Sequence, residues 1–330
     1  MKTAIVILNW NGAKLLPQFL PSVINYSKDA EVYIIDNAST DDSIHLLMTE
    51  FPSVKIIQNN GNYGFAKGYN EGLKQINADY FCLLNSDVEV TENWLQPIEE
   101  LFNQNEKIAA IQPKILDYKN KNYFEYAGAG GGFIDKFGYP FCRGRVFSTL
   151  EEDKGQYNDT TQIFWASGAS LFIRSKDFFA QNGFDEDFFA HMEEIDLCWR
   201  LNNANRKIYY CGESTVYHLG GATLDKSNPK KWYLNYRNSL WMLLKNLPKE
   251  KLFPVIFTRL SLDGIAAIAF LPKQGLPHIW SVFISHVHFY LGFIKMFRKR
   301  QTNQNKNYSN TSLLPVQFFL KKRQYFKDLK

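Results

Sequence analysis

The sequence predicts an α/β fold in which a mostly parallel central sheet is flanked by helices and followed by an apolar helical extension. Three observations predict this fold class. Short β-branched apolar runs alternate with stretches of helical spacing up to residue 84, polar loops follow those runs, and long apolar stretches broken by prolines begin near residue 235. Strands that alternate with helices need crossover connections, which place parallel strands side by side and helices on both faces of the sheet.

The individual elements follow from the spacing of the apolar residues. Strands are expected at 3–8, 32–35, 54–57 and 80–84, and helices at 15–23, 41–51 and 65–76. After Pro113 the sequence becomes rich in glycine and aromatic residues, which predicts loops and irregular strands. A regular pattern then returns, with strands expected at 169–173, 207–210 and 216–218 and a helix at 192–203.

Net charge, cysteine spacing and the N-terminal residues indicate which ligands and which cellular compartment to expect. A net charge of +5 does not indicate nucleic-acid binding, although basic residues gather near the C-terminus at 295–300. The four cysteines show no C-x-x-C spacing, so we expect buried free thiols in a reducing compartment. Met1 and Lys2 lead directly into a strand, without the apolar segment of a secretory signal, which favours a cytoplasmic location.

Two polar loops after predicted strands have the residues to bind a nucleotide. Asp36 follows the second strand and could accept hydrogen bonds from a base or ribose, while Thr40 or Asp41 could cap the next helix. The loop at 59–70 places glycines and Lys67 at a helix start, where backbone N–H groups could hold a diphosphate. Taken alone, such a loop is more often an ordinary connection, and its place at the strand ends favours binding.

Carboxylates and a histidine occupy three further positions. Asp87 leaves the end of a central strand, where it could bind Mg²⁺ or Mn²⁺ or serve as a turn or cap. Glu193, Glu194 and Asp196 open a helix, where they either complement the helix dipole or provide a general base. His218 follows a short strand and is either a structural histidine or a metal ligand.

Several short motifs occur in a fixed order and spacing, which is more specific than any one of them alone. They are LNWNG at 8–12, IDNASTD at 35–41, NYGFAKGYN at 62–70, LNSD at 84–87, SGA at 167–169, GFDE at 183–186 and EEIDL at 193–197. Together they resemble family 2 glycosyltransferases of the GT-A fold, whose central sheet is Rossmann-like, and in particular the bacterial rhamnosyltransferase-like and galactofuranosyltransferase-like branches. The resemblance covers about residues 3 to 221.

The resemblance implies a role for each motif. Asp36 contacts the nucleotide base and Asp87 binds Mg²⁺ or Mn²⁺, while His218 matches a histidine that completes the metal site in some relatives. Asn85 replaces the first aspartate of the family's D-x-D motif, which removes one carboxylate from the metal site. Further donor contacts are expected from Asn9, Asn62, Gly64, Lys67, Asn70, Asn85 and Ser86.

The resemblance also implies the reaction. Glu194 matches the second member of the family's acidic pair and is the expected catalytic base, with Glu193 and Asp196 as alternatives. The base removes the acceptor proton, and the acceptor oxygen attacks the anomeric carbon opposite the diphosphate of a dTDP- or UDP-sugar, which inverts the configuration. The acceptor is a glycan or lipid-linked glycan, in the synthesis of cell-surface polysaccharide or glycolipid.

Other classes of protein fit the sequence less well. A nucleotide-sugar pyrophosphorylase would carry a basic, glycine-rich loop after the first strand, and a nicotinamide-dependent enzyme would carry G-x-G-x-x-G there, whereas residues 9–12 read NWNG. A non-catalytic sugar-nucleotide-binding or scaffold protein with the same fold is the alternative. The presence of Asp87, Glu193 and Glu194 argues against it.

The C-terminal part differs in composition from the rest. We expect a catalytic domain at 1–235, with a donor half at 1–115 and an acceptor and catalytic-base half at 116–235, followed by a helical extension at 236–330. Apolar stretches at 253–271 and 276–297 contain Arg259, Asp263 and three histidines, so interfacial helices with a basic flank fit better than a transmembrane span. A helical subdomain or a homodimer interface is the other interpretation, and the prediction is peripheral association with the inner face of the membrane.

Overall fold

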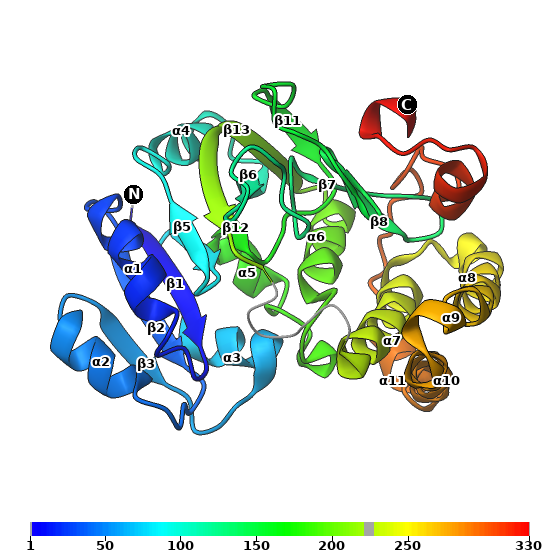
Figure 1. Ribbon diagram of the computed structural model, residues 1–330, viewed down its shortest axis with the longest axis horizontal. Coiled ribbons are helices and arrows are strands. Elements are labelled where there is room, and N and C mark those ends of the chain that lie inside the picture. The colour runs from blue at the N-terminus through cyan, green and yellow to red at the C-terminus, as the bar shows by residue number, and fades with distance from the viewer. Residues whose placement is uncertain (1, 221–227, 330) are drawn as a thin grey trace.

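A nine-stranded sheet forms the centre of the protein (Figure 1). The computed structural model describes residues 2–220 and 228–329. Gly221, at which the family resemblance ends, therefore lies outside the described residues, as does the part of the expected acceptor half at 222–227. The strand order is β11 (Thr160–Ile163), β13 (Lys207–His218), β6 (Ile108–Asp117), β12 (Ser170–Arg174), β4 (Tyr80–Leu84), β1 (Thr3–Asn9), β2 (Glu31–Asp36) and β3 (Lys55–Gln58), with β5 (Val88–Val90) paired to β13.

The N-terminal half of the sheet confirms the crossover pattern that the sequence predicts. Strands β4, β1, β2 and β3 are parallel neighbours, and they are connected through α1 (Leu16–Asn25), α2 (Ser43–Glu50) and α3 (Gly64–Leu73). These elements form where expected because their apolar residues are spaced for burial against the sheet. The register pairs Asn9 with Asp36, which puts the polar residues that follow β1 and β2 at one edge of the sheet.

The sheet as a whole is mixed, so the expectation of a mostly parallel sheet is correct only for its N-terminal half. Strand β12 is antiparallel to both β4 and β6, and β5 and β11 are antiparallel to β13. Two expected strands at 207–210 and 216–218 are one strand, β13. The loops and short strands predicted after Pro113 begin only after Asp117, because β6 continues across Pro113.

Pro113 is accommodated by an irregularity in the neighbouring strand. It pairs with Cys211, next to the point where the register between β13 and β6 shifts. Proline has no backbone N–H to donate, and within sheets it is found at edges and at such bulges.

A small antiparallel sheet fills the region expected to be irregular. It consists of β7 (Gly132–Ile134), β8 (Pro140–Cys142), β9 (Arg145–Val146) and β10 (Thr149–Leu150). The C-terminal segment returns to this sheet, where the Leu314 N–H donates to Asp135 Oδ2 at 2.7 Å. All four cysteines are buried and free, as predicted.

The remaining helices cover the sheet and form the C-terminal extension. Helices α4 (Gln96–Gln104), α5 (Ser175–Ala180) and α6 (Glu193–Asn203) belong to the sheet domain. Helices α7 (Pro229–Asn246), α8 (Lys249–Ala269), α9 (Leu271–Gln274), α10 (Leu276–Leu291) and α11 (Phe293–Arg298) lie together at the side of the molecule opposite α2 and β3 (Figure 1). The predicted domain boundary between residues 235 and 236 falls inside α7, and the division into domains stays a prediction.

Candidate functional site

The carboxyl ends of β1 and β2 place Asn9 and Asp36 next to each other, both almost fully buried. Asp36 Oδ1 accepts hydrogen bonds from Asn9 Nδ2 at 2.9 Å and Ser39 Oγ at 2.5 Å. Asp36 Oδ2 accepts one from the Ser39 backbone N–H at 2.9 Å. Because a carboxylate has about four acceptor positions, one position on Oδ2 is left for a ligand.

The loop at 59–64 leads into α3, and we call it the donor loop. Asn37 Nδ2 donates to Gly64 O at 2.9 Å, and Asn59 Nδ2 donates to Asn37 Oδ1 at 2.7 Å. Gly64 has a φ of +72°, and its N–H donates to the exposed Asn62 at 3.0 Å. The buried amides of Asn37 and Asn59, for which the sequence predicts no role of their own, therefore hold the loop that is expected to face the diphosphate.

Lys67 and Asn70 of α3 point to different surroundings. Lys67 Nζ lies 4.3 Å from the centroid of the Tyr63 ring, at the partly exposed start of the helix. Asn70 is buried, and its Nδ2 donates to Phe184 O at 2.9 Å and to Glu186 Oε1 at 3.2 Å. Its Oδ1 accepts from the Phe184 N–H at 2.9 Å, so the amide joins α3 to a distant segment and has little capacity left for a donor.

The turn after β4 meets the end of β13, where the two predicted metal ligands lie side by side. His218 Nε2 is 3.2 Å from Asp87 Oδ1 and 3.4 Å from Asn85 Nδ2. Asp87 and His218 are both 5% exposed, whereas Asn85 and Ser86 are partly exposed. Side chains from distant parts of the chain thus converge on one position at the sheet edge.

Glu125, for which the sequence carries no motif, faces the other nitrogen of the His218 ring. Its Oε2 lies 3.1 Å from His218 Nδ1, and the glutamate is itself buried. Burial opposes the imidazolium, but hydrogen bonds with Asp87 and Glu125 outweigh it and raise the pKa of His218 to about 10. Glu125 lies in the glycine- and aromatic-rich part of the chain, so only the folded structure brings it to the histidine.

The atoms at this position fit a divalent cation. Two ligands of an octahedral cation at about 2.1 Å lie about 3 Å apart, and Asp87 Oδ1 and His218 Nε2 are 3.2 Å apart. Within residues 2–220 and 228–329, no group of three or more His, Cys, Asp or Glu side chains forms a complete metal site. Two protein ligands would not hold a cation alone, and water and substrate phosphates would have to supply the others.

The acidic pair at the start of α6 is enclosed. In the described part of the chain, Glu193 Oε2 and Glu194 Oε2 are buried atoms without a hydrogen-bond partner. Burial raises the pKa of Glu194 to about 7, although backbone N–H groups at the helix start act in the opposite direction. Burial and the neighbouring Glu194 charge raise the pKa of Glu193 well above its usual value. A carboxylate with a pKa near 7 is suited to accept a proton at neutral pH.

Asp196, the third candidate base, has a different environment. It is fully buried, and its Oδ2 accepts hydrogen bonds from Arg200 Nε at 2.9 Å and Lys245 Nζ at 2.8 Å. Its Oδ1 accepts one from Asn246 Nδ2 at 2.8 Å. These partners surround the carboxylate and join α6 to α7, so the geometry favours a structural role for Asp196.

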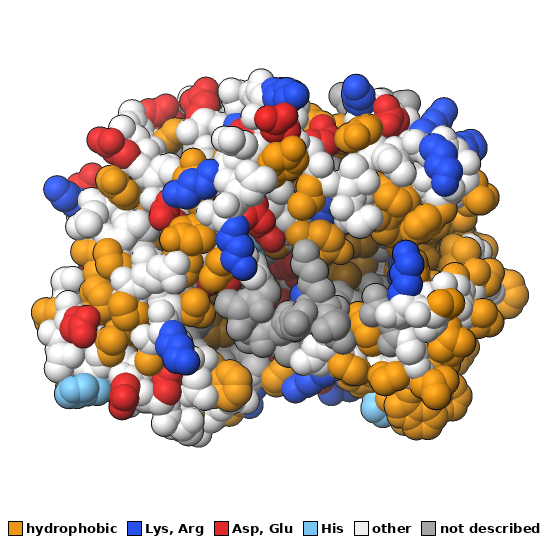
Figure 2. Space-filling view, in the orientation of Figure 1, with side chains coloured by type: hydrophobic (Ala, Val, Ile, Leu, Met, Phe, Trp, Pro, Cys, Tyr) orange, Lys and Arg blue, Asp and Glu red, His pale blue; other side chains and the backbone are white. Residues whose placement is uncertain are grey.

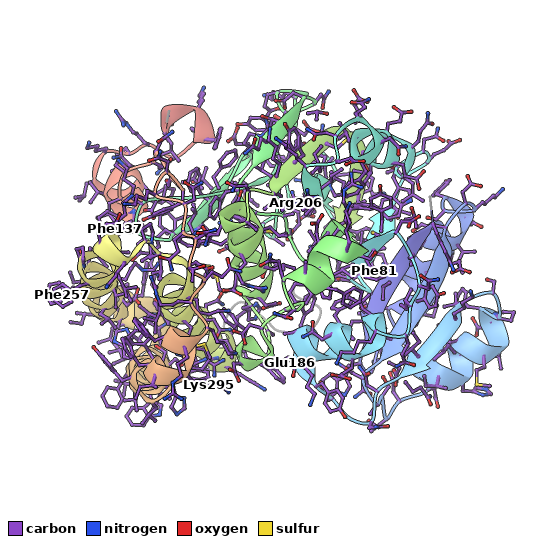
Figure 3. All side chains as sticks on the ribbon, turned by 180° about the vertical axis from the view of Figure 1, so that it is seen from behind. Phe81, Phe137, Glu186, Arg206, Phe257 and Lys295 are labelled. Atoms are coloured by element: carbon purple, nitrogen blue, oxygen red, sulfur yellow. The ribbon has the colours of Figure 1, made fainter. Side chains whose placement is uncertain are left out.

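The turn that precedes α6 contacts the donor loop. Phe189 O accepts hydrogen bonds from the backbone N–H groups of Phe65 at 2.8 Å and Ala66 at 3.3 Å, at the start of α3. In Figure 3, Glu186 of the same segment lies beside α3. The acidic pair, which follows this turn directly, is therefore held next to the predicted diphosphate position.

Helix α6 also approaches the end of β4. The Ala166 N–H donates to Cys198 Sγ of α6 at 3.4 Å, and the Asn85 N–H donates to Ala169 O at 3.0 Å. The 166–169 segment thus joins α6 to the turn that carries Asp87. Figure 2 shows a hollow in the middle of this face, with acidic side chains in its depth.

A second cavity lies elsewhere, between the small sheet and the C-terminal segment. It has a volume of about 470 Å³, and its lining includes Phe133, Phe164, Asn202, Asn305 and Tyr308. None of the predicted site residues, all of which the structure describes, lines this cavity. The predicted residues gather instead at the carboxyl ends of the parallel strands, where α/β sheets bind their ligands.

Comparison with known proteins identifies the family that the sequence motifs indicate. The model of the family described as glycosyl transferase family 2 matches residues 4–175, which is just over half of the chain. An N-acetylglucosaminyl-diphospho-decaprenol L-rhamnosyltransferase of Mycobacterium tuberculosis is 23% identical over 230 residues, covering 65% of this chain and 75% of that protein. The low-salt glycan biosynthesis hexosyltransferase Agl10 of Haloferax volcanii is 22% identical over 297 residues, covering 86% of this chain and 90% of that protein.

Solved structures show the same fold at low identity. The crystal structure of GalNAc-T7 with UDP, GalNAc and Mn²⁺ matches with a TM-score of 0.60 and 15% identity. The match covers 89% of this chain but only 56% of GalNAc-T7. At this identity the similarity extends to the fold alone.

Proposed function

Because the chain belongs to glycosyl transferase family 2, and so transfers a sugar from a nucleotide-sugar donor in glycan synthesis, we propose that it does so with inversion and with a divalent cation. The observation that supports this most directly is the position of α6. This helix begins with Glu193 and Glu194, follows a turn that is hydrogen-bonded to the start of α3, and is joined through the 166–169 segment to the turn of Asp87. These connections support a single site in which the base and the diphosphate ligands act on one donor.

The donor is proposed to lie along the carboxyl ends of β1, β2 and β4. The remaining acceptor position on Asp36 Oδ2 would bind the nucleotide, with Asn9 holding that carboxylate in place. Lys67 and the backbone of the donor loop would bind the diphosphate, because N–H groups at a helix start attract anions. Asn62, Gly64, Asn85 and Ser86 complete the proposed donor contacts. The UDP in the GalNAc-T7 crystal supports a UDP-sugar, and a dTDP-sugar is the other candidate.

Asp87 and His218 are proposed to hold Mg²⁺ or Mn²⁺, with Asn85 as a neutral neighbour. When bound, the cation supplies positive charge that stabilises the departing diphosphate. Glu125 would keep the His218 ring in orientation, since carboxylates commonly hold the second nitrogen of a metal-binding histidine. The GalNAc-T7 crystal contains Mn²⁺, which supports a divalent cation in a protein of this fold.

Glu194 is proposed as the base. Its enclosed Oε2 would take the proton from the acceptor hydroxyl as the acceptor oxygen bonds to the anomeric carbon. The bond from that carbon to the diphosphate oxygen breaks on the opposite side, so the configuration inverts. Glu194 is preferred to Glu193 because it matches the second member of the family's acidic pair, and to Asp196 because that carboxylate is surrounded by partners.

The C-terminal extension is proposed to lie on the inner face of a membrane. By length and composition, α8 is the one helix among the described residues that could cross a membrane, with a mean hydropathy of 1.6. Two of its charged residues are buried, however, since Arg259 and Asp263 are 3% and 1% exposed. Phe257 is 63% exposed and points away from the molecule in Figure 3. Buried charge beneath an apolar surface fits a helix that lies on a membrane rather than one that spans it.

Helix α10 extends the same apolar surface. Trp280 is 63% exposed and Leu291 is 78% exposed, whereas His278 is buried. Figure 2 shows a broad hydrophobic area over this side of the molecule. Patches of this kind on soluble proteins mark interaction sites. A lipid-linked glycan acceptor would be presented at such a surface, and the decaprenol-linked acceptor in the name of the M. tuberculosis relative supports that class.

A transfer assay tests the proposed function. UDP- and dTDP-sugars would be incubated with lipid-linked acceptors in Mn²⁺ or in EDTA, and the anomeric configuration of the product would be read by NMR. We expect transfer with inversion in Mn²⁺ and its loss in EDTA. Donor binding without turnover across the panel would favour the scaffold alternative, and retention of configuration would exclude the proposed mechanism.

A further inference from the structure

The turn that precedes α6 has a strained backbone. Phe189, His191 and Met192 have φ angles of 64°, 70° and 71°, in the left-handed region that side chains other than glycine rarely adopt. Such conformations persist only where the surroundings impose them, and they concentrate at functional sites. The contacts that impose this turn therefore determine where Glu193 and Glu194 lie.

Those contacts come from α7, in the C-terminal part of the chain. Asn238 is fully buried, and its Nδ2 donates to Phe188 O at 3.0 Å, Ala190 O at 2.9 Å and His191 O at 2.8 Å. A single amide group thus binds carbonyls along the whole strained turn. This arrangement satisfies backbone groups that the irregular conformation removes from helical or sheet hydrogen bonding.

Arg237, the preceding residue, extends this contact. Its Nη2 donates to Asp187 O at 3.2 Å and Phe188 O at 3.3 Å, and its guanidinium lies 4.2 Å from the centroid of the Trp241 ring. The planar guanidinium has several donors in fixed positions, so it can bind two carbonyls while it stacks on an aromatic ring.

Lysines of α7, of α11 and of the residue that follows α11 form ion pairs with the segment just before the turn. Lys245 Nζ of α7 is 2.6 Å from Asp185, and Lys299 Nζ is 2.5 Å from Asp185 and 2.7 Å from Asp187. Lys295 Nζ of α11 is 2.5 Å from Asp187. Part of this charge is buried, so these contacts are less screened than pairs on the surface.

The opposite side of the turn meets the donor loop. Phe189 O binds the backbone at the start of α3, and a Cβ at Gly64 would lie 2.6 Å from the Phe189 ring. The turn is thus fixed between α7 on one side and the donor loop on the other, and α6 begins directly after it.

We propose that Asn238 and Arg237 are positioning residues for transfer, which hold the turn at 188–192 so that Glu194 faces the bound donor. This inference rests on the proposed function of Glu194. The C-terminal helices are then part of the catalytic assembly as well as the proposed membrane contact, and they could not be removed as a separate anchor.

Asn238→Ala in the full chain tests the proposal, with Asn235→Ala as the matched control. Asn235 is on the same helix, and its amide donates to Lys231 O within that helix. We expect Asn238→Ala to lower kcat about 100-fold, since small displacements of reacting groups have effects of that size, while the donor KM changes less than threefold. The control variant should keep both constants. A kcat within threefold of the wild type in folded Asn238→Ala would overturn the proposal.

A second measurement separates positioning from general damage. Hydrogen exchange followed by mass spectrometry should show faster exchange at 188–194 in Asn238→Ala and unchanged exchange in β1 and β4. Arg237→Lys keeps the charge but not the two-carbonyl contact, and it should lower kcat about tenfold even if Asn238→Ala does not fold. Unchanged exchange and unchanged kcat in Arg237→Lys would refute the proposal. A wild-type protein that transfers no sugar, with the exchange result as expected, would instead refute the proposed function.

Discussion

The end of β2 and the start of α6 both carry carboxylates, but their hydrogen bonding differs. Asp36 accepts three hydrogen bonds, one from Asn9 of β1 and two from Ser39, whereas Glu193 and Glu194 each keep an enclosed oxygen without a partner within the described residues. The first arrangement stabilises a shape before the donor arrives. In the second arrangement the ionised carboxylates are unfavourable because they are buried, and a proton taken up from a substrate would remove that cost. Such groups are common in active sites. Under the proposed function, the first arrangement would serve donor binding and the second would serve proton transfer.

The largest expected effect comes from removing the base. Glu194→Gln should lower kcat by about a hundred- to ten-thousand-fold, because a positioned general base contributes that much, while donor affinity is kept. Steady-state kinetics and donor titration would measure both. Glu213→Gln, at an exposed glutamate on β13, is the control and should behave as the wild type. Full activity in Glu194→Gln would show that another group accepts the proton.

The next effect concerns the proposed cation. Asp87→Asn should lower transfer about 100-fold at fixed Mn²⁺, because it removes the only carboxylate of the proposed ligand pair and with it much of the charge stabilisation of the diphosphate. The Mn²⁺ dependence of the rate and of donor binding would be measured together. Identical Mn²⁺ titrations for variant and wild type would place the cation elsewhere.

A smaller effect is expected from the carboxylate behind the histidine. Glu125→Gln should weaken the apparent affinity for Mn²⁺ about ten- to a hundredfold, since it removes the charged partner of His218 Nδ1, and saturating Mn²⁺ should restore most of the rate. The test is a Mn²⁺ titration of initial rates. A loss that saturating Mn²⁺ does not restore would argue against a positioning role for Glu125.

The exposed apolar residues of α8 and α10 can be compared with exposed apolar residues elsewhere on the protein. Replacing Phe253, Phe257 and Trp280 with serine should lower binding to anionic vesicles about tenfold or more, because these side chains are 80%, 63% and 63% exposed. Transfer to a soluble acceptor should not change. Serine at the exposed Tyr26, Met48 and Phe179 is the matched control. Equal vesicle binding by both triple variants would exclude this surface as the membrane contact.

The smallest expected effect is on stability, and its sign follows from the raised pKa of Glu194. A carboxyl whose pKa is higher in the folded state stabilises the protein below its unfolded pKa near 4, and this stabilisation is lost as pH rises through about 7. Glu194→Gln, which cannot ionise, should therefore raise Tm by a few degrees at pH 8 and by much less at pH 5. The opposite trend, read by calorimetry, would contradict an enclosed carboxylate.

The sequence predicts the N-terminal half of the fold well because its information is local. The strand at Tyr80–Leu84 and the helices on either side of Asp36 follow from apolar spacing over a few residues. The antiparallel position of β12 between β4 and β6 depends on pairing between distant strands, which spacing along the chain does not record.

Some residues of the candidate site could be predicted from the sequence and others could not. Asp87, His218 and Glu194 match positions of the family and were predicted, and the fold brings Asp87 Oδ1 to 3.2 Å from His218 Nε2. Glu125 and Asn238 contact residues far along the chain, so no local pattern could identify them as candidates. Asn70 and Asp196 match family motifs, yet buried partners occupy their polar groups, which only the three-dimensional arrangement discloses.

The central claim is that Asp87 and Glu194 act on the same bound donor, and a crystal structure of Glu194→Gln with a UDP- or dTDP-sugar and Mn²⁺ tests it most directly. The account predicts Mn²⁺ at about 2.2 Å from Asp87 and His218, next to the diphosphate, with the side chain at position 194 facing the anomeric carbon from the side opposite the diphosphate. A donor bound with position 194 on a separate surface, or a cation bound away from Asp87, would contradict it.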